Sequence, residues 1–146
     1  MTQTPVELPE NMRAAVVTQA GGPENFEWHE TQVPTPGPGQ VLVEAAAAGL
    51  NFIETYQRSG LYAVEYPFIP GSEGSGTVVA LGEGVTNIAV GDRVATASAE
   101  GTYAEFFVAP ADKILPVPDE IDLIEAAAIP LQGMTAHYLC RSTFEV

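Results

Sequence analysis

The sequence predicts a mainly β domain with a few helices, folded as a partly open barrel. Short runs rich in β-branched and aromatic residues recur between turn signals from residue 12 to about residue 120. The chain also carries 14 glycines and 12 prolines, spread along it in turn-like positions. Helical patterning is confined to a stretch after residue 50 and to residues 121–146, so the strands dominate the expected core.

The expected strands are short apolar runs bounded by glycine, proline or acidic turn residues. They are residues 13–18, 26–33, 40–49, 76–81, 92–96, 102–108 and 114–117. The alanines of the 40–49 segment would permit a helix by propensity. Val41, Val43 and the flanking glycines favour a strand instead.

A helix is expected over residues 51–58 and should end at Gly60, a residue suited to a carboxy-terminal cap. Two further helices, 121–129 and 133–141, are expected on either side of Pro130. The domain plan is therefore a flexible arm at 1–11, a barrel at 12–120 and a helical tail at 121–146. A tail that stops just after a helix suggests an interrupted chain, while the alternative is that the tail packs on the barrel.

Composition excludes several classes of function. The net charge is −14, from 19 acidic and five basic residues, which disfavours binding to nucleic acid or to an anionic membrane surface. Cys140 is the single cysteine, so no intramolecular disulfide can form. No signal peptide or membrane-spanning run is evident, and a cytoplasmic protein is expected.

A family resemblance enters at residues 49–62, which read GLNFIETYQRSGLY. Other segments agree in the same order along the chain: GGPE at 21–24, PGSEGSG at 70–76, GEGV at 82–85, GDRV at 91–94, GTYAE at 101–105, and 126–136. Over residues 12–146 the chain resembles the medium-chain dehydrogenase/reductase superfamily, in its zinc-independent quinone oxidoreductase (zeta-crystallin-like) branch.

The resemblance implies a GroES-like, partly open β-barrel followed by a doubly wound nucleotide-binding domain, with NADPH in the cleft between them. In that family the last part of the chain returns to complete the barrel. Hydride passes from NADPH to a quinone or a similar activated carbonyl compound. The sequence has no Gly-x-Gly-x-x-Gly motif, so the nucleotide-binding Rossmann domain is expected to be absent from this chain.

Zinc is not expected. In metal-bearing relatives the matching positions hold a cysteine and a histidine beside a glutamate, whereas this chain has Asn51, and Ser72 beside Glu73. Neither an amide nor a hydroxyl is a good zinc ligand. Without a metal, Glu73 is expected to form an ion pair with Arg93 or Arg58.

The resemblance assigns catalytic positions to Asn51, Tyr56 and Tyr62, and cofactor-binding positions to Asn51, Gln132 and Thr135. An amide can donate to a carbonyl oxygen or accept from a ribose or carboxamide group, and a tyrosine can stack on a flat quinone. Each residue also has an ordinary interpretation. Asn51 suits a helix N-cap, the tyrosines could be half-buried aromatics, and Thr135 could bond its own helix backbone.

Two functions stay open. The first is the catalytic domain of an NADPH-dependent quinone oxidoreductase, in which the cofactor carries the hydride and solvent supplies the proton. The second is a stand-alone barrel that binds a partner or small ligand without redox chemistry. Because a glycine turn at a helix amino-terminus is missing, the chain alone is expected to bind little NADPH and to show no turnover. Unpaired strand edges predict a homo-oligomer.

Overall fold

The computed structural model describes residues 8–143 of the chain. Its strands in that range are β1 (Asn11–Val17), β2 (Phe26–Gln32), β3 (Gln40–Ala48), β4 (Gly74–Leu81), β5 (Arg93–Thr96), β6 (Phe106–Pro110) and β7 (Leu115–Pro116). Its α-helices are α1 (Phe52–Ser59), α2 (Leu123–Ala126) and α3 (Pro130–Tyr138), and α3 continues into a π-helical turn at Leu139–Thr143. The mainly β prediction is confirmed. Within the same range no helix has the length and apolar character needed to cross a bilayer.

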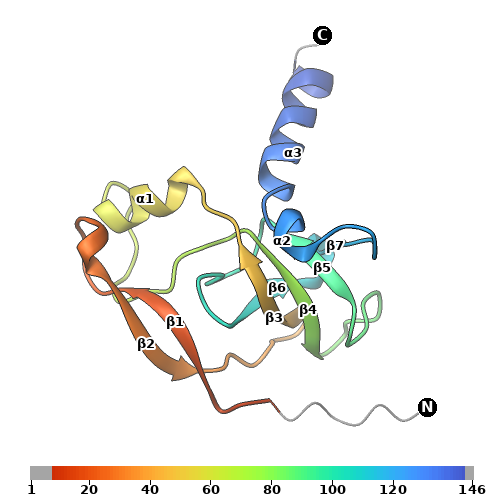
Figure 1. The fold of residues 1–146 in the computed structure, drawn as a ribbon, viewed down its shortest axis with the longest axis horizontal. Helices are drawn as coiled ribbons and strands as arrows, with labels where there is room; N and C mark the ends of the chain where they lie inside the picture. The colour runs from red at the N-terminus through yellow and green to blue at the C-terminus, as the bar shows by residue number, and fades with distance from the viewer. Residues whose placement is uncertain (1–7, 144–146) are drawn as a thin grey trace.

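The strands form two antiparallel sheets, which together make the partly open barrel (Figure 1). The larger sheet has the order β6-β3-β4-β5-β7, and β1 pairs with β2 in a separate hairpin. Residues 103–105 join the two sheets. The N–H of Ala15 donates to the Tyr103 carbonyl at 2.8 Å, and the N–H of Ala45 in β3 donates to the Glu105 carbonyl at 2.9 Å.

Residues 41–43 of strand β3 are buried on both faces of the strand and lie at the centre of the core. Val41 and Val43 point to one side, into a cluster with Val78 and Phe107. Leu42 points to the other side and packs with Met12 and Phe106. Alternate residues of a strand face opposite sides of a sheet, so a continuous apolar run is what a doubly covered strand requires.

Two predicted elements differ from the structure. The expected strand at 102–108 begins only at Phe106, because residues 103–105 cross over to pair with β1 before the chain joins β3. The two expected helices are present as α2 and α3, but Pro130 does not separate them, because it is the first residue of α3. A missing N–H costs nothing there, because the first turn of a helix has no intrahelical acceptor for it.

Helix α1 ends as predicted. Gly60 is its C-cap with φ +82°, and its N–H donates to the Gln57 carbonyl at 3.2 Å. This left-handed conformation is open to glycine at little cost.

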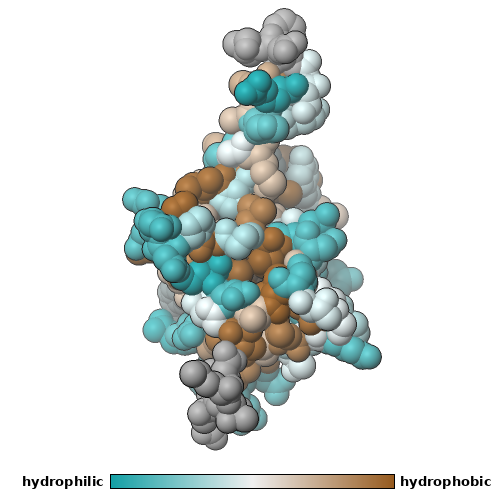
Figure 2. All heavy atoms as spheres, turned by 90° about the vertical axis from the view of Figure 1, so that its right-hand side faces the viewer, coloured by the Kyte–Doolittle hydropathy of each residue, from teal (hydrophilic) through white to brown (hydrophobic). Residues whose placement is uncertain are grey.

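The amino-terminal end of the described range packs on the barrel, whereas the carboxy-terminal helix projects from it. Leu8 packs against the cluster of Met12, Leu42 and Phe106, and β1 begins at Asn11, inside the expected arm. The rest of that arm, residues 1–7, lies outside the described residues, as do residues 144–146 of the expected tail. Helix α2 packs on the large sheet, whereas α3 projects from it (Figure 1). Figure 2 shows apolar side chains gathered on the body of the molecule below that projection.

Candidate functional site

The candidate site is built where β3 ends and β4 begins. Ala48, the last residue of β3, pairs with Gly74, the first residue of β4. The pairing continues one step further, since the N–H of Gly49 donates to the Glu73 carbonyl at 2.9 Å. Asn51 and Glu73 therefore meet although they lie 22 residues apart in the sequence.

Glu73 is fully buried at this point, and its carboxylate is the hub of the site. Oε2 accepts from Asn51 Nδ2 at 2.8 Å, and Oε1 accepts from the backbone N–H of Leu131 at 2.8 Å. Leu131 is in the first turn of α3, where unpaired N–H groups favour an anion. A carboxylate held by N–H donors can be buried without a cation beside it.

The ion pair expected for Glu73 is therefore wrong. The Arg58 guanidinium donates to the Gly21 carbonyl at 3.1 Å. The Arg93 guanidinium donates to the carbonyls of Pro118 and Ile121 and lies 3.6 Å from Asp119 Oδ1. Both arginines are used to tie loops to the barrel, and the N–H donors of Asn51 and α3 replace them at Glu73.

Gln132 completes the cluster, and the orientation of its amide matters. With Nε2 toward Asn51 it would donate to Oδ1 at 3.2 Å, but its oxygen would then face the acceptors Glu73 Oε1 and the Ala128 carbonyl. In the opposite orientation the NH2 group donates to Glu73 Oε1 at 3.2 Å and to the Ala128 carbonyl at 2.9 Å. We adopt the second orientation because it gives the NH2 group two acceptors. It places the Gln132 oxygen 3.2 Å from Asn51 Oδ1.

Asn51 is the N-cap of α1, as its ordinary interpretation predicted, and it forms a capping box with Glu54 in which the Asn51 side chain faces the backbone N–H of Glu54. The backbone N–H of Asn51 donates to Glu54 Oε2 at 2.7 Å, which is the backbone half of a capping box. The Asn51 amide meanwhile bonds Glu73. Sequence reasoning missed Glu54, although the Asn-x-x-Glu spacing of residues 51–54 is the pattern that signals such a box.

Burial raises the pKa of Glu54, and the Asn51 N–H bond and the nearby Glu73 carboxyl act on it in opposite directions. Glu54 Oε1 is buried without a hydrogen-bond partner among residues 8–143. Desolvation of an unpaired carboxylate oxygen favours the protonated form, which explains the direction of the shift.

Gly49 allows the carboxylate to reach this position. A Cβ built on Gly49 would lie 2.3 Å from Glu73 Oε2 and 2.8 Å from the Ala127 carbonyl oxygen. The second contact is with backbone, which has no freedom to rotate away. A glycine is therefore required where β3 leaves the sheet and passes Glu73.

The two predicted tyrosines form a pair on and beside α1. Their ring centroids lie 5.4 Å apart at 55°, and Phe52 lies 6.3 Å from Tyr56. Tyr56 and Tyr62 are about 37% and 50% exposed, so both side chains lie partly at the surface. Offset and tilted rings of this kind can receive a flat apolar ligand.

Thr135 lies one turn beyond Gln132 on the same face of α3, since residues three apart are neighbours on a helix. Its side chain is exposed. The structure thus brings Asn51 and Gln132 into contact around Glu73, pairs Tyr56 with Tyr62, and leaves Thr135 further along α3.

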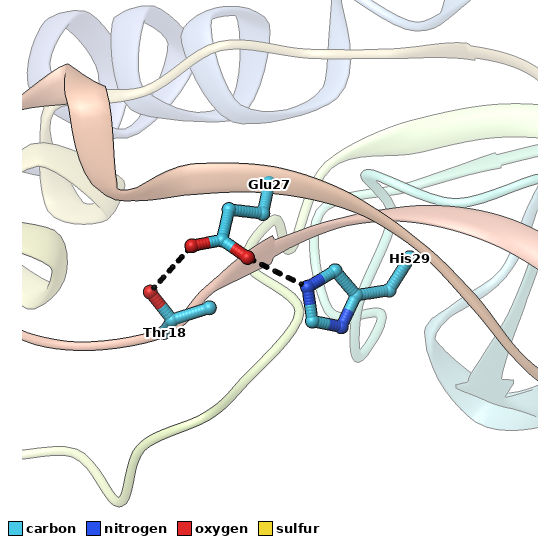
Figure 3. Close-up of polar contacts among 3 residues, drawn as sticks. All are labelled: Thr18, Glu27 and His29. Carbon is cyan, nitrogen blue, oxygen red and sulfur yellow. Dashed lines mark hydrogen bonds and ion pairs between the residues drawn. The ribbon is translucent and has the colours of Figure 1, made fainter.

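A second polar cluster lies on the exposed face of the β1–β2 hairpin (Figure 3). Glu27 is its centre, accepting from Thr18 Oγ1 at 3.4 Å and lying 3.0 Å from His29 Nε2. The hydroxyl meets the carboxylate and not the imidazole, so this is no nucleophile–base pair. Among residues 8–143 no group of three or more His, Cys, Asp or Glu side chains is placed to hold a metal ion.

A cavity of about 690 Å³ lies between β2 and the end of β3, and its lining reaches Ala48 and Leu50 beside the candidate site. Its walls include Phe26, Trp28, Ala46 and Tyr103. Asn51, Tyr56 and Gln132 do not line it, so the assignment of the candidate site depends on the Glu73 hydrogen bonds and not on cavity size.

Comparison with known proteins identifies the class of domain. Residues 37–119 match the alcohol dehydrogenase GroES-like domain, which agrees with the partly open barrel. A quinone oxidoreductase of Pseudomonas aeruginosa is 48% identical over 130 residues, covering 86% of this chain and 39% of that protein. A 2-haloacrylate reductase of a Burkholderia species is 42% identical over 140 residues, covering 91% of this chain and 42% of that protein.

Solved structures support the same class of protein. A mycobacterial protein whose structure is a complex with NADPH superposes with a TM-score of 0.89 at 50% identity, over 92% of this chain and 42% of that one. The chain belongs to the medium-chain dehydrogenase/reductase superfamily, in the branch of zinc-independent quinone oxidoreductases.

The chain spans about two fifths of the length of the relatives it matches. The matched part is the GroES-like domain, and residues 8–143 contain no doubly wound nucleotide-binding domain. The predictions of family and fold class are confirmed.

Proposed function

We propose that this chain is the catalytic-type domain of an NADPH-dependent quinone oxidoreductase, and that Asn51, Tyr56, Tyr62, Gln132 and Thr135 form its side of the active site. One observation supports this most strongly. A fully buried carboxylate, Glu73, organises the amides of Asn51 and Gln132 at the start of the helix that carries Tyr56. A purely structural barrel does not require two amides to converge on one buried carboxyl group.

The residues present fit one end of the cofactor. The carbonyl oxygens of Asn51 and Gln132 lie 3.2 Å apart, and both are acceptors. A carboxamide NH2 or a ribose hydroxyl is the kind of donor that such a pair binds. The phosphate end finds no counterpart here, because the chain has five basic residues against 19 acidic ones and no glycine-rich phosphate turn.

When bound, NADPH would supply the hydride. The two amides would orient the nicotinamide end, and we propose that the hydroxyl of Thr135, one turn further along α3, adds a contact. The rings of Tyr56 and Tyr62 would stack on a flat quinone and shield part of it from water. Since both tyrosines are half exposed, we propose that solvent delivers the proton to the reduced oxygen.

The decisive experiment joins this chain to the remainder of a relative. In a chimera, the matching 86% of this chain replaces the corresponding 39% of the Pseudomonas aeruginosa quinone oxidoreductase. We expect the chimera to oxidise NADPH in the presence of a quinone, and the isolated chain to show neither calorimetric NADPH binding nor turnover. A folded chimera that binds NADPH but reduces no quinone or activated alkene would overturn the proposal and favour a binding module without redox activity.

We also propose that the chain self-associates. Leu131, Met134 and Tyr138 are apolar side chains of α3 that lie partly exposed. A homo-oligomer would cover these side chains. The net charge of −14 makes nucleic acid or an anionic membrane a poor alternative partner. The compartment we propose is the cytoplasm. Sedimentation at increasing concentration tests this, and a monomer throughout would contradict it.

A further inference from the structure

Glu73 controls more than the packing of the site. Its two carboxylate oxygens receive the NH2 group of Asn51, the backbone N–H of Leu131 and, in the orientation adopted above, the NH2 group of Gln132. These donors come from the N-cap of α1 and from the first turn of α3. A single buried side chain therefore determines which atom of each amide faces it.

The consequence concerns the other end of each amide. An amide has a donor end and an acceptor end, and a carboxylate can only accept. With both NH2 groups committed to Glu73, the two carbonyl oxygens are left facing each other at 3.2 Å. Two acceptor oxygens at this distance repel one another unless a donor group forms hydrogen bonds with them.

We propose that Glu73 is a positioning residue that sets the polarity of the Asn51–Gln132 amide pair, so that this subsite receives the N–H or O–H group of a ligand. Asn51 acts there as a hydrogen-bond acceptor. Of the two roles first expected for Asn51, donor to a carbonyl oxygen and acceptor from a ribose or carboxamide group, this proposal selects the second. The ligand consequence rests on the proposed function, whereas the polarity itself can be tested without any cofactor.

The first test is hydrogen exchange of side-chain amides in the 146-residue chain, followed by nuclear magnetic resonance. The NH2 group of Asn51 should exchange at least about tenfold more slowly than that of the exposed Asn11, because hydrogen bonds to a charged group are worth more than neutral ones. Glu73→Gln should remove most of this protection. Glu44→Gln, which makes the same charge change at an exposed site of β3, should leave it unchanged.

A second test reverses the polarity and does not depend on the first variant folding well. Asn51→Asp alone places two carboxyl groups in contact, and Glu73→Gln alone removes an acceptor from a buried donor. In the double variant, the carboxylate introduced at position 51 can accept from the amide introduced at position 73, and an acceptor oxygen still faces Gln132. We expect the equilibrium constant for unfolding of the double variant to be about tenfold smaller than the product of the two single effects predicts.

The functional consequence is measured in the chimera. Glu73→Gln should raise the KM for NADPH about tenfold while changing the KM for quinone less than about twofold, since the lost order lies at the cofactor subsite. An inactive chimera would count against the proposed function and leave the exchange result standing. Fast exchange of the Asn51 NH2 group in the unaltered chain, unchanged exchange in a folded Glu73→Gln variant, or additive unfolding effects would each overturn the role of Glu73.

Discussion

The backbone N–H of Asn51 donates to Glu54 Oε2 at 2.7 Å, and this bond holds a carboxyl group whose other oxygen is buried without a partner among the described residues. The arrangement positions the start of α1, and with it the amide that reaches Glu73. It does so at a cost in desolvation, which appears as the raised pKa of Glu54.

The first prediction follows from that cost. A carboxyl group with a raised folded-state pKa binds its proton more tightly in the native state, so its contribution to stability falls as pH rises through and above its ordinary value of 4.5. Glu54→Gln keeps an acceptor for the Asn51 N–H and removes the charge. We compare the free energies of unfolding of the variant and the unaltered chain by urea unfolding. The difference in favour of the variant should be about 1 kcal/mol larger at pH 8 than at pH 4. Glu83→Gln, at an exposed turn, should show no such gain.

The second prediction concerns Tyr103. Burial raises its pKa to about 12, with a smaller contribution from Glu54, and its hydroxyl has no hydrogen-bond partner within residues 8–143. The unfolded chain ionises this phenol first, near its ordinary pKa of 10, so the free energy of unfolding should fall between about pH 10 and pH 12.

Tyr103→Phe should remove that pH dependence and raise stability by about 1 kcal/mol at pH 8, because an unsatisfied buried hydroxyl is destabilising. Thermal unfolding at pH 8 and pH 11 is the measurement. Tyr138→Phe, at an exposed position of α3, is the control. Equal slopes with pH for the unaltered chain and Tyr103→Phe would contradict the assignment of the shift to this residue.

The third prediction is that Asn51→Asp destabilises the chain in a pH-dependent way. It replaces a donor 2.8 Å from Glu73 Oε2 with a second carboxyl group. Two adjacent carboxylates cannot both ionise without strain, so we expect a loss of about 2 kcal/mol at pH 7 that shrinks near pH 4 as one of them takes a proton. Chemical unfolding at both pH values decides the matter, with the exposed Asn11→Asp as the matched control.

The fourth prediction is that Gly49→Ala is disruptive although alanine is small. Its Cβ would lie 2.8 Å from the Ala127 carbonyl oxygen, so the chain must shift, and we expect a loss of about 2 kcal/mol together with loss of Asn51 NH2 protection. Gly133→Ala offers a control within α3, where the added Cβ would meet Ile129 Cγ2 at an ordinary 3.5 Å. That change should be stabilising by about 1 kcal/mol, as expected for glycine in a helix.

Much of the fold could be predicted because local signals agreed with the tertiary structure. The β-branched residues Val41 and Val43, in a run flanked by turn residues, predict β3, and Gly60 predicts the end of α1. The prediction of a strand over residues 102–108 was wrong at its start, and the reason lies in the tertiary structure. Residues 103–105 have strand-like composition, but they pair across the barrel with β1 before the chain runs along β3, and no local signal distinguishes the two.

For the site, as for the fold, some properties follow from the sequence and others from the tertiary structure. The sequence by itself determined the chemical types available: an amide at 51, a carboxyl at 73, tyrosines at 56 and 62, and only five basic residues against 19 acidic ones. Only the tertiary structure decided their partners. Glu73 could pair with an arginine or with N–H donors, and the choice depended on the register of β3 against β4 and on where α3 begins. Hydrogen bonds between residues 22 and 58 positions apart are set by the packing of whole elements, which no local pattern encodes.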